Sequence, residues 1–303
     1  MSGIISTGST PKLLWPGLDE IWGLAYKEKI PQWRELFEIN YSDKNYEEDV
    51  GLTGMGLAPV KVEGEALSYD TMKQSFITRY TNVAYSIGFV ITREEIADNL
   101  YKQFGAQRAK NVAYSMHQTK ENVAANIFNR AFNNSYAGGD GVSLVNALHP
   151  TEGGTLSNTL TVAADLSEAA LEQAIIDIDQ FRDNRNNHIE VKALKLLVPP
   201  SLRFDAARIL KNPQRPATAD RDINAMYTLG VLPQGYTVNN YLTDTDAWFV
   251  LTDCPSSLKY FERSAPVFES DNDFTTKNAL FSGYERYSFG FTDWRGIYGS
   301  PGA

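Results

Sequence analysis

The sequence has little of the side-chain chemistry from which catalytic and metal sites are usually built. Its 303 residues include one cysteine, Cys254, and three histidines that lie too far apart in sequence to suggest a shared metal ion. A single cysteine excludes an internal disulfide framework, so packing and hydrogen bonds must hold the fold together. We expect Cys254 to be a small buried thiol.

Long apolar runs and a surplus of positive charge are also missing. Nowhere do about 18 apolar residues follow one another, and no basic segment precedes an apolar one at the N-terminus, so neither a membrane span nor a secretory signal is predicted. The net charge of -9 argues against a free-standing nucleic-acid binder, because such proteins neutralise phosphates with surplus lysine and arginine. Only the segment 93–130 is locally basic, with 6 basic and 4 acidic groups.

The enzyme motifs that occur fail on spacing or context. Ser256 and Lys259 match the S-x-x-K of penicillin-recognising enzymes, but no K-T-G exists in the chain and Ser256 is predicted to lie in a loop, so a serine hydrolase is the weakest function considered. His149 could pair with Asp140, but a turn histidine beside a glycine-rich turn is the favoured interpretation. We therefore predict that the chain is not an enzyme and holds no cofactor or metal ion.

What the sequence does have is apolar and aromatic surface, at 43% and 12% of its residues, which is enough for a large core. The first 35 residues are predicted to form an arm in which one short helix ends before Pro31. Its apolar face includes Leu18 and Trp22. A helix this short is marginal alone, so it must dock on its own body or on a neighbour.

Residues 36–74 are predicted to form a long two-stranded excursion. Its strands are expected at 36–42 and 58–69, on either side of an acidic, glycine-rich segment. A two-stranded ribbon is not stable in water unless a partner surface covers it. Tyr46, Leu52 and Met55 are therefore predicted to contact a neighbouring subunit.

The next segment combines strand and helix signals. Residues 75–91 alternate between apolar and polar side chains and change phase near Asn82, which predicts two strands or one bulged strand. Thr92 and Glu95 then form the signature of a capping box. From Ile96 to about Asn134 the apolar spacing is helical, which predicts a rod about 60 Å long that is covered on one side by the strands.

The remaining elements complete a mixed chain. A helix is predicted within 164–183, and a buried strand at 193–198 is followed by a helix with Ser201 as its N-cap. Further strands are expected at 247–253, at 258–264 and near the C-terminus. An arm, a hairpin that cannot stand alone and a glycine-rich tip together indicate a chain that completes its core with neighbours.

Several segments, in this order, carry a resemblance to a known family. They are "VEGEALSYDTMKQSFITRYTNVAYSIGFVITREEIADNLY", the long predicted helix, "DGVSLVNALHP" and "FTDWRGIYGS". From about residue 17 to 300 the chain resembles the major capsid proteins of tailed bacteriophages, which implies an α+β fold of the Hong Kong 97-like kind. The parts implied are an N-terminal arm (1–35), an extended loop (36–82), a peripheral domain with a spine helix (83–140 and 255–303) and an axial domain (141–254).

The resemblance also implies a function and its partners. The subunits would form hexamers and pentamers of an icosahedral phage head around packaged double-stranded DNA, assembled in the host bacterial cytoplasm and found in the virion. Other copies, a portal protein and the DNA are expected partners, and a decoration protein is a further candidate. Family members with a cleavable scaffolding domain begin with a charged helical segment that is absent here, which implies a separate scaffolding protein or a longer precursor.

Two finer expectations follow from the resemblance. The basic residues of the spine segment, Arg93, Lys102, Arg108 and Lys110, are candidates for an inner surface that contacts DNA without sequence preference. Some members weld their subunits through a lysine and an asparagine. Lys44 and Lys61 lie in the loop, but noncovalent locking is expected because no matching partners are identified. The alternative function is the shell of an encapsulin-like nanocompartment, which shares the fold and differs in its contents.

Overall fold

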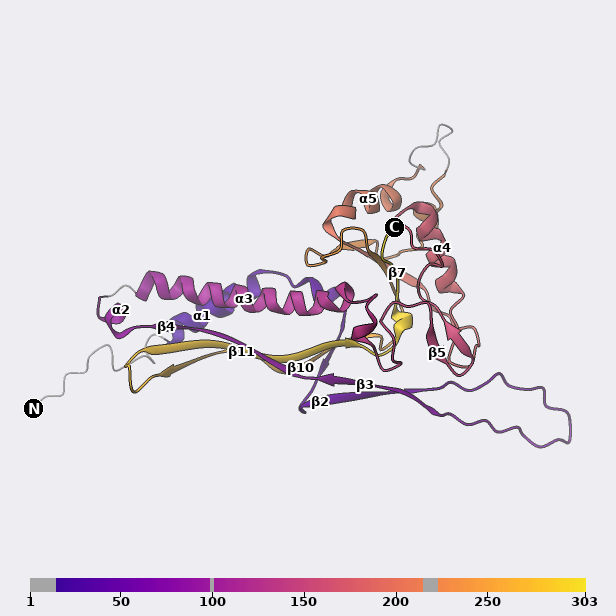
Figure 1. Ribbon diagram of the computed structural model, residues 1–303, viewed down its shortest axis with the longest axis horizontal. Coiled ribbons are helices and arrows are strands. Elements are labelled where there is room, and N and C mark those ends of the chain that lie inside the picture. The colour runs from indigo at the N-terminus through magenta and orange to yellow at the C-terminus, as the bar shows by residue number, and fades with distance from the viewer. Residues whose placement is uncertain (1–14, 99–100, 215–222) are drawn as a thin grey trace, which may run out of the picture.

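The computed structural model describes residues 15–98, 101–214 and 223–303, which form an elongated helix-and-sheet body, a smaller domain and a protruding ribbon (Figure 1). The mixture of helices and strands confirms the predicted α+β class. The long sheet has the order β1 (Glu38–Tyr41), β10 (Leu258–Asn272), β11 (Ala279–Phe291) and β4 (Val83–Ile91). The short sheet has the order β12 (Ile297–Ser300), β9 (Trp248–Thr252), β7 (Ala193–Val198) and β8 (Tyr236–Val238). Within these ranges, no helix combines the length and apolar character that crossing a membrane requires.

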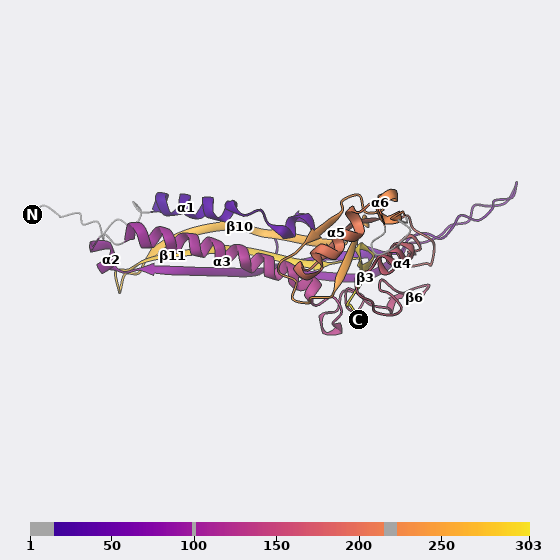
Figure 2. The same cartoon turned by 90° about the horizontal axis from the view of Figure 1, so that it is seen from above.

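Two helices lie along the long sheet. α3 (Tyr101–Asn129) runs beside β4 and β11, and α1 (Trp15–Glu28) packs next to α3, as Figure 2 shows from above. Leu18 and Trp22 of α1 are buried in the core that α3 forms with the sheet, so the arm helix docks on its own chain. Gly283 in β11 allows α3 to come close, because a Cβ at that position would overlap the sulfur of Met116. Residues 1–14 of the predicted arm lie outside the described residues.

The predicted continuous rod is wrong at both ends. α2 (Arg93–Ala97) is separate from α3, and the guanidinium of Arg108 lies 2.8 Å from the carboxylate of Glu95. In one continuous helix these residues would be about 20 Å apart along the axis, so the ion pair is incompatible with a single straight helix. With 29 residues, α3 is about 44 Å long and ends at Asn129, before the predicted Asn134.

A buried lysine ties α3 to α1 and to the long sheet. The Nζ atom of Lys120 lies 3.2 Å from Oε2 of Glu285, and the Tyr26 hydroxyl donates to the same oxygen over 3.1 Å. Burial raises the pKa of Glu285, and the charge of Lys120 opposes that shift. The ammonium also lies 5.3, 4.9 and 4.7 Å from the ring centres of Trp33, Tyr260 and Tyr287.

The phase change in residues 75–91 marks a division between two sheets. β3 (Gln74–Thr81) belongs to the ribbon and β4 to the long sheet, and only the buried Asn82 separates them, which confirms the prediction of two strands. The predicted capping box at the start of α2 is also confirmed. The amide of Glu95 donates to Oγ1 of Thr92 over 3.2 Å, and the amide of Thr92 donates to the Glu95 carboxylate over 3.1 Å.

The smaller domain is built on the short sheet. α4 (Glu168–Asp179), α5 (Arg203–Lys211) and α6 (Ala225–Leu229) enclose a core with Leu196, Val198 and Trp248 on the sheet side. The opposite face of the sheet carries Leu197 and Phe249, which belong to the core shared with α3. The small domain is therefore joined to the body by a continuous apolar contact rather than by a linker.

Two predictions for this region need correction. Ser201 does not cap the following helix, because its hydroxyl donates to the carbonyl of Thr245 and a short 3-10 turn (Pro200–Leu202) precedes α5. The C-terminal segment near Phe291 divides into two elements: β11 stays in the long sheet, while β12 pairs with β9 and forms an edge of the short sheet. The helix predicted within 164–183 and the strand at 193–198 are confirmed as α4 and β7.

Candidate inter-subunit surfaces

The extended loop projects from the body as a ribbon whose strands differ from those predicted (Figure 1). β2 (Tyr46–Leu52) pairs antiparallel with β3, and residues 53–73 connect them. The segment expected as the outgoing strand lies in the long sheet as β1, parallel to β10, and residues 58–69, all of them described, form no strand. The strands form only where the chain's own body covers one face of the ribbon, since an uncovered strand pair is marginal in water.

The inner face of the ribbon is held by the body. Tyr80 is buried, and its hydroxyl lies 2.6 Å from Oγ1 of Thr292. The same threonine donates to the carboxylate of Asp49 over 2.7 Å, and Asp49 also accepts from the ammonium of Lys259. These contacts fix the ribbon on the end of the long sheet.

The opposite face of the ribbon is exposed, and we call it the outer ribbon face. It carries Tyr46, Val50, Leu52 and Ile77, and Val50 lies directly across from Ile77 in the strand register. Glu48 and Arg79 pair on this face at 2.6 Å, and the Arg79 guanidinium lies 4.3 Å from the centre of the Tyr46 ring. An apolar surface with one ion pair at its centre is suited to protein contact.

A polar latch holds the base of the loop to the smaller domain. The carboxylate of Asp70 accepts from the backbone amides of Gly56 and Thr71, each over 2.8 Å, and from the guanidinium of Arg185. Arg185 also donates to the carbonyl of Thr71 over 2.6 Å. The two backbone donors, followed by Arg185, lower the pKa of Asp70 to about 2, so the latch is charged at neutral pH.

The loop tip, residues 53–73, contains the latch residues Gly56, Asp70 and Thr71, is otherwise rich in exposed apolar side chains and projects away from the body (Figure 1). Tyr46, Leu52 and Met55, the residues predicted to meet a neighbour, are all exposed, and the contact itself stays a prediction. The large exposed apolar side chains of the tip are Met55, Leu57, Val60, Val62, Leu67, Tyr69 and Met72.

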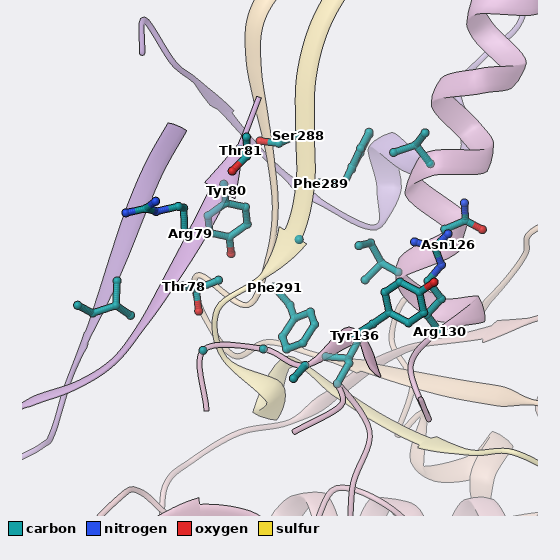
Figure 3. A pocket seen from close by; sticks show the side chains of 18 of the residues that line it. Thr78, Arg79, Tyr80, Thr81, Asn126, Arg130, Tyr136, Ser288, Phe289 and Phe291 are labelled. Carbon is teal, nitrogen blue, oxygen red and sulfur yellow. The ribbon is translucent and has the colours of Figure 1, made fainter. Parts of the chain in front are cut away.

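A cleft of about 520 Å³ lies between the ribbon and the C-terminal end of α3 (Figure 3). Phe289 and Phe291 line it, and at its edge the Arg130 guanidinium lies 4.2 Å from the centre of the Tyr136 ring. Gly139 closes one side, because a Cβ there would lie 2.6 Å from Oγ1 of Thr78. The described lining contains no carboxylate, histidine, cysteine or lysine, so the cleft offers no general base at neutral pH.

The basic residues predicted for an inner surface differ in their surroundings. Arg93 and Lys110 are exposed. Arg108 is half-buried, pairs with Glu95 and donates to the carbonyl of Val90 over 3.0 Å, so little of its charge is left for an outside partner. The side chain of Lys102 lies outside the described residues.

The residues proposed for a serine hydrolase are not arranged for that chemistry. Ser256 lies in an exposed turn with φ 58°, whereas Lys259 is buried and its ammonium pairs with Asp49 of the ribbon. The amine of Lys259 is thus engaged by the ribbon carboxylate, whereas a serine hydrolase would need it at the Ser256 hydroxyl. Cys254, predicted to be buried, is partly exposed, and burial raises the pKa of its thiol to about 12.

His149 and Asp140 do pair, which the sequence had left open, and His149 begins the short strand β5 (His149–Thr151), so its interpretation as a turn histidine is wrong. Nδ1 of His149 lies 2.6 Å from the Asp140 carboxylate, Nε2 lies 3.1 Å from Oδ1 of Asn158, and the ring stacks on Trp294 at 4.3 Å. The histidine is fully buried. Since both ring nitrogens have protein partners, the pair is a structural link between the chain segments that meet there.

Two contacts on these surfaces carried no recognisable signal in the sequence. Asp70 and Arg185 are 115 residues apart, and Asp49 and Lys259 are 210 apart. Charged residues without helical or strand spacing between them give no local pattern, so only covariation between relatives could have revealed these pairs.

Comparisons with known proteins agree with this geometry. A protein-family model described as "Phage capsid protein" matches residues 77–300. No curated protein sequence matches the chain. Among solved structures, a virus-like particle from Pyrococcus furiosus has 10% identity and a TM-score of 0.57, and the match covers 95% of this chain and 99% of that one.

Two phage structures are also similar. The procapsid of bacteriophage JBD30 has 14% identity and a TM-score of 0.53, with 97% of this chain and 76% of that one covered. Mycobacterium phage Che8 has 15% identity and a TM-score of 0.50, with 89% and 90% covered. At such identities the likeness establishes the fold, while the family match spans most of the sequence. The chain therefore belongs to the phage capsid protein family, and its fold is the Hong Kong 97-like fold of tailed-phage major capsid proteins.

Proposed function

We propose that this chain assembles with copies of itself into hexamers and pentamers, which form the icosahedral head of a tailed phage around packaged double-stranded DNA. The observation that carries the proposal is the loop tip, where seven large apolar side chains are exposed in a segment that projects away from its own body. Such a surface is unfavourable in water until another molecule covers it. We propose a second copy of this chain as the covering molecule, because every subunit presents the same surface to its neighbour.

The parts of the chain take the roles that the family resemblance implies. The ribbon and tip, residues 46–81, form the extended loop that lies over an adjacent subunit. The long sheet with α1 and α3 forms the peripheral domain, and the domain on the short sheet forms the axial domain near the symmetry axes. These boundaries differ from the predicted ones at two strands. We assign β1 to the peripheral domain and β12 to the axial domain, because β1 pairs in the long sheet and β12 pairs in the short sheet.

Contact with DNA in this proposal is weak and without sequence preference. Arg93 and Lys110 are exposed and available to phosphates, whereas Arg108 is neutralised by Glu95. With so few free cations among the described side chains of α2 and α3, the shell would hold its genome by enclosure more than by attraction, which matches the net charge of -9.

The other partners follow from the family resemblance alone. A portal protein at one vertex, a separate scaffolding protein during assembly and a decoration protein on the outside remain proposals, as does assembly in the host cytoplasm. The role is structural, with no turnover chemistry. Noncovalent locking is proposed in place of a crosslink, and Lys44 in fact lies near the base of the ribbon, 3.5 Å from Glu47.

A nanocompartment shell is the second candidate. The likeness to the virus-like particle from Pyrococcus furiosus, with a TM-score of 0.57, favours it to the same extent as a phage head, because the fold is common to both. The two differ in what the shell encloses.

Sedimentation and analysis of particle contents test the proposal. The purified protein should sediment as capsomers or shells, and particles recovered from producing cells should contain DNA for a phage head or a protein cargo for a nanocompartment. A chain that stays monomeric at high concentration, with its loop intact, would contradict both candidates.

A further inference from the structure

The two longer helices of the smaller domain carry opposite charge. α4 has four carboxylates and no basic residue, whereas α5 has three basic residues and one carboxylate. Glu172 and Asp179 lie on the solvent side of α4, while Asp177 of the same helix is occupied by the hydroxyl of Tyr298, which donates to it over 2.5 Å. On α5, Arg203 and Arg208 are exposed, and Arg208 also pairs with Asp205 of the same helix over 2.6 Å. The helices are therefore an acidic and a basic surface on one domain.

These helices lie at opposite edges of the short sheet. The sheet has the order β12, β9, β7, β8; α4 contacts the edge strand β12 and α5 contacts the edge strand β8. Tyr298 of β12 bonds to α4, and Tyr236 of β8 lies 5.3 Å under the ammonium of Lys211 of α5. Figure 1 shows the two helices on different sides of the domain. The acidic and basic surfaces therefore lie at different edges of one domain.

Each helix also presents one large apolar side chain in the middle of its charged residues. Ile176 of α4 is 49% exposed and lies one helical turn from both Glu172 and Asp179. Phe204 of α5 is 69% exposed, next to Arg203 and one turn from Arg208. An apolar centre with a charged rim is the usual anatomy of a specific protein contact.

We infer that α4 of one copy docks on α5 of the next copy, with Ile176 against Phe204 and with Glu172 and Asp179 facing Arg203 and Arg208. Two surfaces on opposite edges of one domain give a head-to-tail contact, which closes into a ring when the rotation between copies permits. Pairing of α4 with α4 is disfavoured, because carboxylates would face carboxylates. The inference rests on the proposed function and names the contact that would close its hexamers and pentamers.

Charge reversal on each helix tests the contact. Glu172→Lys with Asp179→Lys makes both surfaces basic, and Arg203→Glu with Arg208→Glu makes both acidic. All four positions are at least partly exposed, so the subunit should still fold, which circular dichroism and the thermal midpoint would check. Each variant alone should form rings at least tenfold less well than the natural chain in sedimentation. The variant with all four changes restores opposite charges and should recover ring formation.

A mixture of the two reversed variants gives a sharper test. In an alternating ring every contact pairs an acidic with a basic surface, but alternation closes only when the number of subunits is even. The mixture should therefore form hexamers and no pentamers, which mass measurement of intact rings would resolve. Ile176→Ser and Phe204→Ser, which change no charge, should each also weaken ring formation.

The outcomes separate the inference from the proposal on which it rests. If the natural chain assembles and both reversed variants assemble equally well, α4 and α5 do not meet, and the inference is overturned while the proposed shell function stands. Recovery of pentamers from the mixture would overturn it too. If the natural chain does not assemble, both fall together.

Discussion

Leu52→Asp should block assembly while leaving the subunit folded. Leu52 lies on the outer ribbon face and is 61% exposed in the isolated chain. Full burial of a leucine side chain is worth about 1.5–3 kcal/mol, so covering the exposed share against a neighbour contributes about 1–2 kcal/mol to each loop contact. Burying an unpaired carboxylate in its place adds at least about 1–3 kcal/mol of penalty.

These terms predict a large loss at each contact. Together they weaken it by about 2–5 kcal/mol, which is roughly 30-fold to more than 1,000-fold in the association constant. The isolated subunit should lose only about 0.5 kcal/mol, because the side chain already faces water there. Leu52→Met, which keeps the apolar surface, is the matched control and should assemble normally.

The assay pairs sedimentation with thermal unfolding of the same samples. The expected result is an aspartate variant that unfolds within about 2 °C of the natural chain and remains as separate subunits at concentrations where the methionine variant forms capsomers. If the aspartate variant assembled like the control, the outer ribbon face would not meet a neighbour. If it unfolded the isolated subunit, the assignment of Leu52 to an exposed loop strand would be wrong.

Three further predictions concern the subunit itself. Glu285→Gln should lower the free energy of unfolding by about 3–5 kcal/mol in urea titration, because the charge of Lys120 stays buried without a partner. Adding Lys120→Met should recover most of this loss. An unchanged urea midpoint for the single variant would contradict the role of the pair. Gly283→Ala should lower the free energy of unfolding by about 1–3 kcal/mol, because the new methyl group forces Met116 aside. Gly23→Ala in α1, where no atom lies within 4 Å of the new Cβ, should instead raise the free energy of unfolding by roughly 0.5–1 kcal/mol. Equal effects of the two variants in differential calorimetry would refute the packing argument. Since the pKa of Asp70 is about 2 in the folded chain and about 4 ordinarily, the latch to Arg185 is fully present above about pH 4 and is lost as the pH falls through 2. A spin label on a cysteine introduced at position 67, in a chain that also carries Cys254→Ser, should gain mobility between these pH values. A label that is equally mobile at pH 6 would contradict the latch.

Local patterns in the sequence predicted the elements well where burial has a regular period. The apolar face of α1 with Leu18 and Trp22, the phase change at Asn82 and the capping box at Thr92 each follow from the spacing of neighbouring residues, and the structure confirms all of them. The family resemblance supplied the architecture, which spacing alone does not specify.

Pairing between distant segments could not be predicted in the same way. Residues 36–42 and 58–69 alternate like strands, yet β1 joins β10 and the second segment pairs with nothing, since the register depends on which surface covers the ribbon. The sequence allows His149 to pair with Asp140, but isolated pairs of this kind are seldom functional sites, so spacing alone favours a turn histidine. The positions of α4 and α5 at the two edges of the short sheet could not be predicted either, because they depend on the strand order.

Hydrogen exchange of the loop tip in two states tests the central claim most directly. Backbone amides of residues 57–69, between the latch residues Gly56 and Asp70, should exchange rapidly in the isolated subunit and become protected in the assembled particle, while amides around Tyr80, which its own chain already buries, should change little. Protection of the tip in a lone subunit, or unchanged rapid exchange in the particle, would contradict the conclusion that the tip is covered by another copy.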